Sequence, residues 1–176
     1  MTIDRIFVEN LFAFHYNDEE DNELDRLLEL WNDPEYLHNY FIENENFIIN
    51  NPSLNISSES QFIQNVIENA QDTDEILEEL SENQNLEEFF IELSESQPLY
   101  EILSKRKGRK NILRIYAIKI DKNCFVITGG AIKITKKMQE HKTTTNELKK
   151  LEKCKSFLKE QDIINSDSFY ELLNEM

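Results

Sequence analysis

Two neighbouring β-type segments constrain the fold of this chain more than any other feature of its sequence. Apolar and polar side chains alternate over Ile112–Ile120, which is typical of a half-buried strand. A second β-type run, Cys124–Ile134, follows after the turn Asp121-Lys122-Asn123, so the pair is predicted to form an antiparallel hairpin with a three-residue loop. Gly129-Gly130 inside the second strand indicates a bulge or a close backbone approach.

A third β-type segment lies far away in the sequence, and a helical block separates it from the hairpin. Arg5–Tyr16 is rich in Phe, Ile and Val with partial alternation, whereas Glu23–Ser96 has helical periodicity. Because strands gain stability by pairing, Arg5–Tyr16 is expected to join the hairpin in one sheet. The sequence therefore predicts an α+β fold with a small antiparallel sheet and a large acidic helical insertion after the first strand.

Apolar stripes and helix caps divide the helical block into segments. Leu24, Leu27, Leu28 and Trp31 are spaced for one face of a helix, so Trp31 is expected in the core. Further helices are expected from the Asp33-Pro34 cap to about Asn44, from the Ser58/Gln61 capping box onward, from Asp74, and over Leu86–Leu93. A final helix is expected to begin at Thr145 as its N-cap, and Phe169–Leu173 is expected to form a short helical turn.

Charge is segregated along the chain. The predicted organisation is one domain over residues 1–176, with the acidic insertion over 22–104 and a basic hairpin-plus-helix part over 105–160. Residues 1–104 contain 26 acidic and 2 basic residues, whereas residues 105–160 contain 17 basic and 5 acidic residues. A basic surface concentrates anionic partners, so any nucleic-acid contact is expected on the second part.

Several classes of protein are disfavoured by the sequence. No apolar run approaches the roughly 20 residues of a membrane helix, and the first ten residues lack a secretory pattern, so a cytoplasmic protein without membrane contact is expected. Cys124 and Cys154 lie in apolar settings outside any CxxC pair, which favours packed, reduced thiols. No metal-ligand spacing, P-loop or GxGxxG pattern is present, so neither a metal nor a cofactor is predicted.

The basic residues of the second part are the candidate functional groups. The predicted catalytic set is Arg114, Lys119, Lys133, Lys136 and His141. Arg114 and Lys119 are five positions apart on one strand and therefore point to opposite faces. Cations on a sheet surface can hold phosphates and stabilise a developing negative charge, although they can equally be ordinary solubilising residues.

The segment Leu113 to His141 resembles the RelE/HigB-like toxins of bacterial toxin–antitoxin pairs. The likeness lies in an arginine-bearing strand (Arg114), a tight turn (Asp121–Asn123), an aliphatic strand (Phe125–Ile127) and a lysine-rich stretch with Lys133, Lys136 and Lys137. The chain as a whole is also similar to a Bacteroidetes-type group of uncharacterised proteins that are usually encoded beside a helix-turn-helix antitoxin. The points of likeness are Trp31-Asn32, Tyr36-Leu37, Tyr40-Phe41, Arg114–Ile120 and Thr128–Lys133. The resemblance implies a sheet of RelE-like type that carries the acidic helices as an insertion.

If the family's chemistry is retained, the resemblance implies metal-free cleavage of mRNA, on or off the ribosome, by attack of the ribose 2′-OH on the adjacent phosphate. Arg114, Lys133 and Lys136 would hold the phosphate, and Lys119 or His141 would move protons. The expected partner is a helix-turn-helix antitoxin. The alternatives are a non-catalytic protein- or RNA-binding module, and a regulatory partner protein without enzymatic activity.

Overall fold

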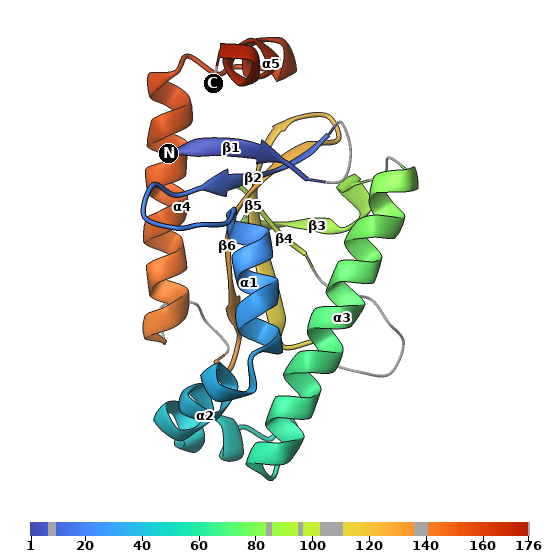
Figure 1. The fold of residues 1–176 in the computed structure, drawn as a ribbon, viewed down its shortest axis with the longest axis vertical. Helices are drawn as coiled ribbons and strands as arrows, with labels where there is room; N and C mark the ends of the chain where they lie inside the picture. Colours follow the sequence, from blue (N-terminus) through green and yellow to red (C-terminus); the bar gives the residue numbers. More distant parts are fainter. Residues whose placement is uncertain (7–9, 84–85, 95–96, 103–110, 136–140, 176) are drawn as a thin grey trace.

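The computed structural model describes residues 1–6, 10–83, 86–94, 97–102, 111–135 and 141–175, which form an α+β fold around one six-stranded sheet. Figure 1 shows helices on both sides of this sheet. The strands are β1 (Thr2–Arg5), β2 (Leu11–His15), β3 (Phe90–Ser94), β4 (Gln97–Ile102), β5 (Leu113–Asp121) and β6 (Cys124–Ile132). They lie in the order β1-β2-β6-β5-β4-β3. The predicted α+β class is confirmed.

The sheet is mixed, whereas the sequence analysis expected an antiparallel one. Within the single strand expected over Arg5–Tyr16, only Leu11–His15 forms a strand, β2; Arg5 is the last residue of a separate strand, β1, which pairs with β2 in antiparallel fashion. The polypeptide reverses between them, so β2 runs parallel to β6, with Leu11 opposite Phe125 and Ala13 opposite Ile127. The hairpin of β5 and β6 is antiparallel as predicted. Asp121 pairs with Cys124, so its loop has two residues, Lys122 and Asn123, in place of the three expected.

Five α-helices cover the sheet in the part of the chain that the structure describes: α1 (Glu23–Asn32), α2 (Pro34–Ile49), α3 (Glu59–Asn83), α4 (Lys142–Glu160) and α5 (Ser166–Glu175). The first three share one face of the sheet, and α4 and α5 lie on the other. The chain therefore folds into three layers, with the sheet in the middle.

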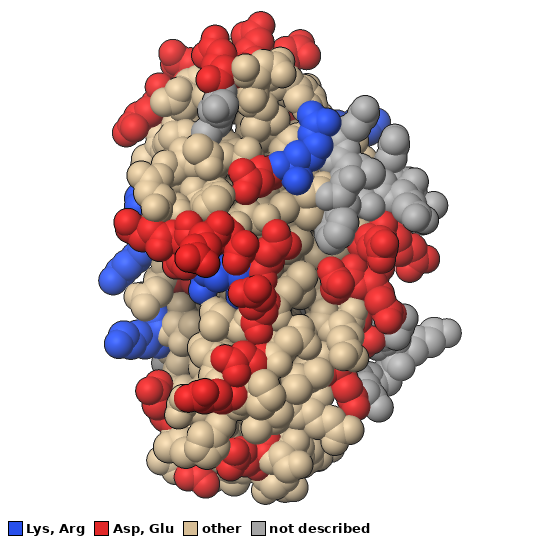
Figure 2. Space-filling model, viewed as in Figure 1, with Lys and Arg blue, Asp and Glu red and all other residues tan. Residues whose placement is uncertain are grey.

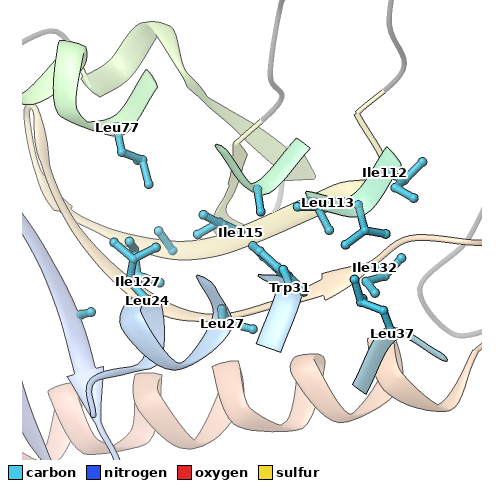
Figure 3. Close-up of a cluster of buried hydrophobic side chains, with 14 of the residues drawn as sticks. Leu24, Leu27, Trp31, Leu37, Leu77, Ile112, Leu113, Ile115, Ile127 and Ile132 are labelled. Atoms are coloured by element: carbon cyan, nitrogen blue, oxygen red, sulfur yellow. The ribbon is translucent and has the colours of Figure 1, made fainter. Parts of the chain in front are cut away.

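The larger core lies between the sheet and α1–α3. Trp31 is 1% exposed and is surrounded by the aliphatic side chains of α1, β5 and β6, as the apolar stripe predicted (Figure 3). The smaller core on the other face joins Phe12 and Phe14 of β2 to Cys154 and Phe169 of α4 and α5. Both faces of the central strands are thus buried, which explains why β6 is buried along its whole length.

Three local predictions are wrong. The two helices expected from the Ser58/Gln61 capping box and from Asp74 are one continuous helix, α3. The helix expected over Leu86–Leu93 is a short 3-10 turn at Leu86–Glu88 that leads into β3, where Phe90 stacks on Phe125 with ring centroids 4.4 Å apart. The predicted acidic helical insertion thus also contributes strands β3 and β4 to the sheet. The last long helix begins at Lys142, with His141 as its N-cap where Thr145 was expected.

No helix among the described segments is long and apolar enough to cross a membrane. Cys124 and Cys154 are both free and buried. Burial raises the pKa of the Cys124 thiol to about 11 and that of Cys154 to about 12, so both thiols are protonated at neutral pH.

Candidate functional site

Arg114 and Lys133 lie on the same face of the sheet, toward α4. Their neighbours Leu113, Ile115 and Ile132 point into the core beneath α1–α3, so alternation turns Arg114 and Lys133 the other way. Arg114 is opposite Ala131, which makes Lys133, the first residue after β6, its diagonal neighbour. The Arg114 guanidinium donates to the backbone carbonyls of Asn111 and Leu113, each at 2.7 Å, so part of its hydrogen bonding serves the start of β5.

Lys119 is separated from these two residues. It sits near the far end of β5 and on the opposite face, because Ala117 two positions earlier lies in the core beneath α1–α3. Its ammonium forms an ion pair with Glu87 at 2.5 Å. This ion pair is the first cause of the lowered pKa of the Glu87 carboxyl. The structure therefore does not bring Lys119 together with Arg114 and Lys133.

His141 has a structural role at the start of α4. Its Nδ1 accepts a hydrogen bond from the backbone N–H of Thr143 at 3.3 Å, and its Nε2 lies 2.6 Å from Asn44 Oδ1. Burial lowers the pKa of the imidazole, which favours the neutral form with Nε2 as the donor to Asn44. Both ring nitrogens are therefore engaged. Lys136, the remaining residue of the predicted set, lies outside the described residues, as does Lys137.

A second set of cations lies along α4. This helix carries six lysines and three glutamates. Lys142, Lys149 and Lys153 are exposed and recur at intervals of seven and four residues, which places them on one side of the helix. We call these three residues the α4 lysine face. Figure 2 shows lysine and arginine side chains at the left margin of the molecule, where α4 runs in Figure 1, and mainly acidic side chains over α1–α3.

A surface cleft of about 420 Å³ adjoins the α4 lysine face. Its polar and aromatic lining comes from the N-terminus, the segment after β2, and α4: Met1, Tyr16, Asn17, Asp18, Lys153, Ser156, Phe157 and Glu160. The Lys153 ammonium lies 5.9 Å from the centre of the Tyr16 ring. The cleft thus places an aromatic ring beside a cation, which suits a base with its phosphate.

A β-bulge in β6 lies close to this cleft. Tyr116 pairs with Gly129 and Ala117 with Ile127, so Thr128 is the extra residue. This confirms the bulge that Gly129-Gly130 indicated. At Gly130, a Cβ would lie 2.7 Å from the Arg114 carbonyl oxygen and 2.8 Å from Leu27 Cδ1, so glycine is what lets α1 pack this closely.

Gly129 has a different neighbour, the carboxylate of Glu147 on α4. A Cβ at Gly129 would lie 1.9 Å from Glu147 Oε2, so the carboxylate occupies the space that any other side chain would fill. The same Cβ would lie 3.5 Å from Glu23 Oε1, at the start of α1. Since β2 pairs with β6 only over Leu11–Ala13, α1 and α4 meet beyond the end of that pairing. The two carboxylates converge there.

Two cations complete this group, which we call the bulge cluster: Glu23, Arg26, Glu147 and Lys150. Glu23 Oε1 accepts from Arg26 Nη2 at 2.7 Å and from Lys150 Nζ at 2.6 Å, and Arg26 Nε reaches Oε2 at 3.0 Å. Lys150 also lies 3.4 Å from Glu147 Oε1. The side chains of Glu23 and Glu147 are 1% and 7% exposed, whereas those of Arg26 and Lys150 are 22% and 31% exposed. The cluster therefore opens to the surface through its cations.

Glu147 is the unusual member of the bulge cluster. Its Oε2 is buried and has no hydrogen-bond partner among the described residues. Burial, together with the charge of Glu23, raises the pKa of the Glu147 carboxyl to about 7, even though Lys150 opposes the shift. At neutral pH this carboxyl therefore exists in both protonation states, which is the property needed to accept and return a proton.

Tyr16 lies between the cleft and the bulge cluster. Its hydroxyl donates to the Thr128 carbonyl at 2.7 Å and lies 3.1 Å from Cys154 Sγ, and burial raises its pKa. The ammonium groups of Lys150 and Lys153 lie 5.4 and 5.9 Å from the centre of the Tyr16 ring, and the Phe14 ring stacks on it at 6.3 Å. Tyr16 thus contacts both the cleft and the bulge cluster, and α4 contributes side chains to each of these two sites.

The sequence analysis missed the bulge cluster and the α4 lysine face as functional groups. Their local signal is Glu147-x-x-Lys150 on an amphipathic helix, but this spacing is also common on solvated helices. Glu23 and Arg26 are more than a hundred positions away and looked like members of the acidic block. The two glycines were the one usable clue, because a glycine pair in a buried strand indicates that something approaches closely.

No protein-family model, curated protein or solved structure matches this chain, so the site is interpreted from its own geometry. Within the residues described, no group of three His, Cys, Asp or Glu side chains is placed to hold a metal ion.

Proposed function

We propose that this protein is the toxin-like component of a toxin–antitoxin pair and that it acts on RNA as a metal-free endoribonuclease. The observation that carries the proposal is the α4 lysine face, which lies beside a cleft that contains Tyr16 and Lys153. Cations at helical spacing bind successive phosphates, and an aromatic ring stacks on a base. The resemblance of Leu113–His141 to RelE/HigB-like toxins supports the same class of substrate.

The predicted cations contribute in part to this assignment. Arg114 and Lys133 lie on the face of the sheet that α4 covers, and they extend the positive charge toward the start of the hairpin. Lys119 and His141 are excluded from the proposed RNA site because of their contacts with Glu87 and Asn44. The proposed partner is a helix-turn-helix antitoxin with an acidic segment that covers Lys133 by charge complementarity.

The experiment measures RNA retention and bacterial growth for the same variants. Lys149→Glu/Lys153→Glu should weaken RNA retention. The slope of log binding constant against log salt concentration should become shallower by about 1.4 to 1.8, because two phosphate contacts are lost. The matched control is Lys122→Glu/Lys159→Glu, which makes the same charge change at two other exposed positions and should retain RNA like the wild type.

Induced expression of the wild type should arrest growth with loss of mRNA, and co-expression of the neighbouring antitoxin gene should restore growth. The double variant Lys149→Glu/Lys153→Glu should be less toxic than its control. Wild-type protein that retains no RNA at low salt, or that leaves growth unchanged, contradicts the proposal.

A non-catalytic protein-binding module is the second candidate, and a surface on α2 favours it. Ile42 and Ile49 are 59% and 38% exposed and lie seven positions apart, on one side of α2, with the exposed Glu45 beside them. Apolar side chains surrounded by acidic ones suit a basic amphipathic partner. Growth without arrest, combined with co-purification of a basic protein that Ile42→Asp abolishes, would favour this module over the toxin.

A further inference from the structure

We propose that Glu147 and Lys150 are the catalytic pair of the RNA site, with Glu147 as the general base toward the ribose 2′-OH and Lys150 as the cation that holds the phosphate and protonates the leaving 5′-oxygen. This inference rests on the proposed RNA-directed function. It concerns the bulge cluster, which the sequence analysis did not identify.

The first argument is the geometry of the pair. Glu147 Oε1 faces Lys150 Nζ at 3.4 Å, on the side where the cluster opens to the surface. The other oxygen, Oε2, is fixed against Gly129. The carboxyl therefore has one oxygen packed against the bulge and one that faces the partly exposed Lys150 ammonium. A general base needs this combination, because its reactive oxygen must be held in place and still be within reach.

The second argument is the way in which Lys150 is held. Its ammonium and the Arg26 guanidinium bind the same oxygen of Glu23, at 2.6 and 2.7 Å. Glu23 is thus a positioning residue that places two partly exposed cations side by side. A phosphodiester between them would contact both, and the charge that develops on its oxygens would be stabilised without movement of either side chain.

The third argument is the energetic cost of the cluster. Burying ionised groups is expensive, and apolar residues of similar volume are often as stabilising or more so. Glu147 adds to this cost, since its Oε2 lacks a hydrogen-bond donor among the described residues. Its raised pKa is consistent with such an environment. An arrangement this unfavourable for stability is typical of groups retained for chemistry.

The reaction balances within the pair. The 2′-OH gives its proton to Glu147, and the 2′-oxygen forms a bond to phosphorus as the bond from phosphorus to the 5′-oxygen breaks. The departing 5′-oxygen takes a proton from the Lys150 ammonium. Glu147 then returns its proton to Lys150 across the short distance between them, which restores the starting state. The products are a 2′,3′-cyclic phosphate and a 5′-hydroxyl, and no metal or other reactant is needed.

The test compares cleavage with binding in the full chain. Glu147→Gln should lower the rate of cleavage of a single-stranded RNA by at least about 100-fold, while RNA retention and its salt dependence stay within about twofold of the wild type. The matched control is Glu152→Gln on the same helix, whose side chain is 63% exposed and pairs with Lys155; it should cleave like the wild type. Wild-type cleavage should rise with pH up to about 7 and then level off, as expected for a base with the pKa of Glu147.

The experiment distinguishes failure of the proposed RNA function from failure of the proposed catalytic pair. Wild-type protein that retains no RNA contradicts the proposed function itself. Retention without a cyclic-phosphate product, or cleavage by Glu147→Gln within about threefold of the wild type, overturns the catalytic pair and leaves RNA binding intact. Thermal unfolding of each variant shows whether a loss of cleavage reflects chemistry or loss of the fold. If Glu147→Gln proves unstable, Lys150→Arg keeps the charge and should still retain RNA, but should cleave at least about tenfold more slowly because a guanidinium does not give up its proton.

Discussion

Helices α1–α3 on one face of the sheet and the long helix α4 on the other carry opposite charge and differ in what they bury. Helices α1, α2 and α3 contain fourteen acidic residues and one basic residue, whereas α4 has six lysines and three glutamates. The acidic side packs on the sheet through Leu, Ile, Phe and Trp and leaves most of its carboxylates in solvent. The α4 side buries Glu147 and reaches Glu23 across the end of a strand pairing.

The comparison shows two kinds of charged residue: solvated ones, which keep a protein soluble, and buried ones, whose altered proton affinity suits them to catalysis. Solvated carboxylates keep ordinary properties, and their number says little about function. A carboxyl that the fold removes from water and places beside cations has altered proton affinity. The few ionisable residues at the bulge are therefore more informative than the many on the acidic helices. The three predictions that follow test this contrast.

Replacing Trp31 should have the largest effect, since it lies in the apolar core of the acidic side. Trp31→Ala should lower the free energy of unfolding by about 3 to 5 kcal/mol, because a large cavity forms beneath α1. Denaturant unfolding followed by circular dichroism measures this loss. Phe47→Ala, at a half-exposed aromatic on α2, is the control and should cost far less; a loss under about 1 kcal/mol for Trp31→Ala would contradict the burial of this side chain in the core.

The second prediction uses pH to detect the buried carboxyl on the α4 side. The pKa of Glu147 is raised from 4.5 to about 7, so folding favours its protonated form. Its stabilising contribution is present below about pH 4.5 and is lost as the pH rises to about 7. A glutamine at position 147 does not ionise, so the Glu147→Gln variant does not lose this stability as the pH rises. The free energy of unfolding of the variant should therefore gain on the wild type by up to about 3 kcal/mol between pH 4.5 and pH 8.

Chemical denaturation of both proteins at several pH values measures this difference. Glu152→Gln should show no such gain, because its carboxyl is exposed. If the free energies of unfolding of Glu147→Gln and the wild type differ by the same amount at every pH in this range, the pKa of Glu147 is not raised by folding. The two faces of the sheet would then not differ in the proton affinity of their carboxyl groups.

The smallest effect is expected at Lys119, the predicted site residue that the structure places on the acidic side. Lys119→Ala removes a partly exposed ion pair with Glu87 and should leave the free energy of unfolding nearly unchanged, because water and salt screen such pairs. RNA retention should equal that of the wild type, measured beside Lys149→Glu/Lys153→Glu. A loss of RNA binding in Lys119→Ala would move the proposed site to the other face of the sheet.

The sequence by itself determined those features that depend on neighbours along the chain. The alternation in β5 and β6, the stripe that buries Trp31, the cap at Asp33 and the bulge beside Gly129-Gly130 all follow from local periodicity or local backbone needs. The α+β class followed as well, because strand-type and helix-type segments alternate on a scale that periodicity detects. The relation of Arg114 to Lys119 was also predictable, since strand geometry fixes which face each residue takes.

Only the tertiary structure decided which charged residues meet. The parallel pairing of β2 with β6 ends at Ala13, and past that end Glu23 at the start of α1 meets Lys150 of α4. Glu23 and Lys150 are 127 positions apart, so no local pattern relates them. Phe90 becomes part of a strand because it can stack on Phe125, although its own sequence suits a helix. The proton affinity of Glu147 likewise follows from burial and from neighbours on another helix, and neither is a property of its position in the chain.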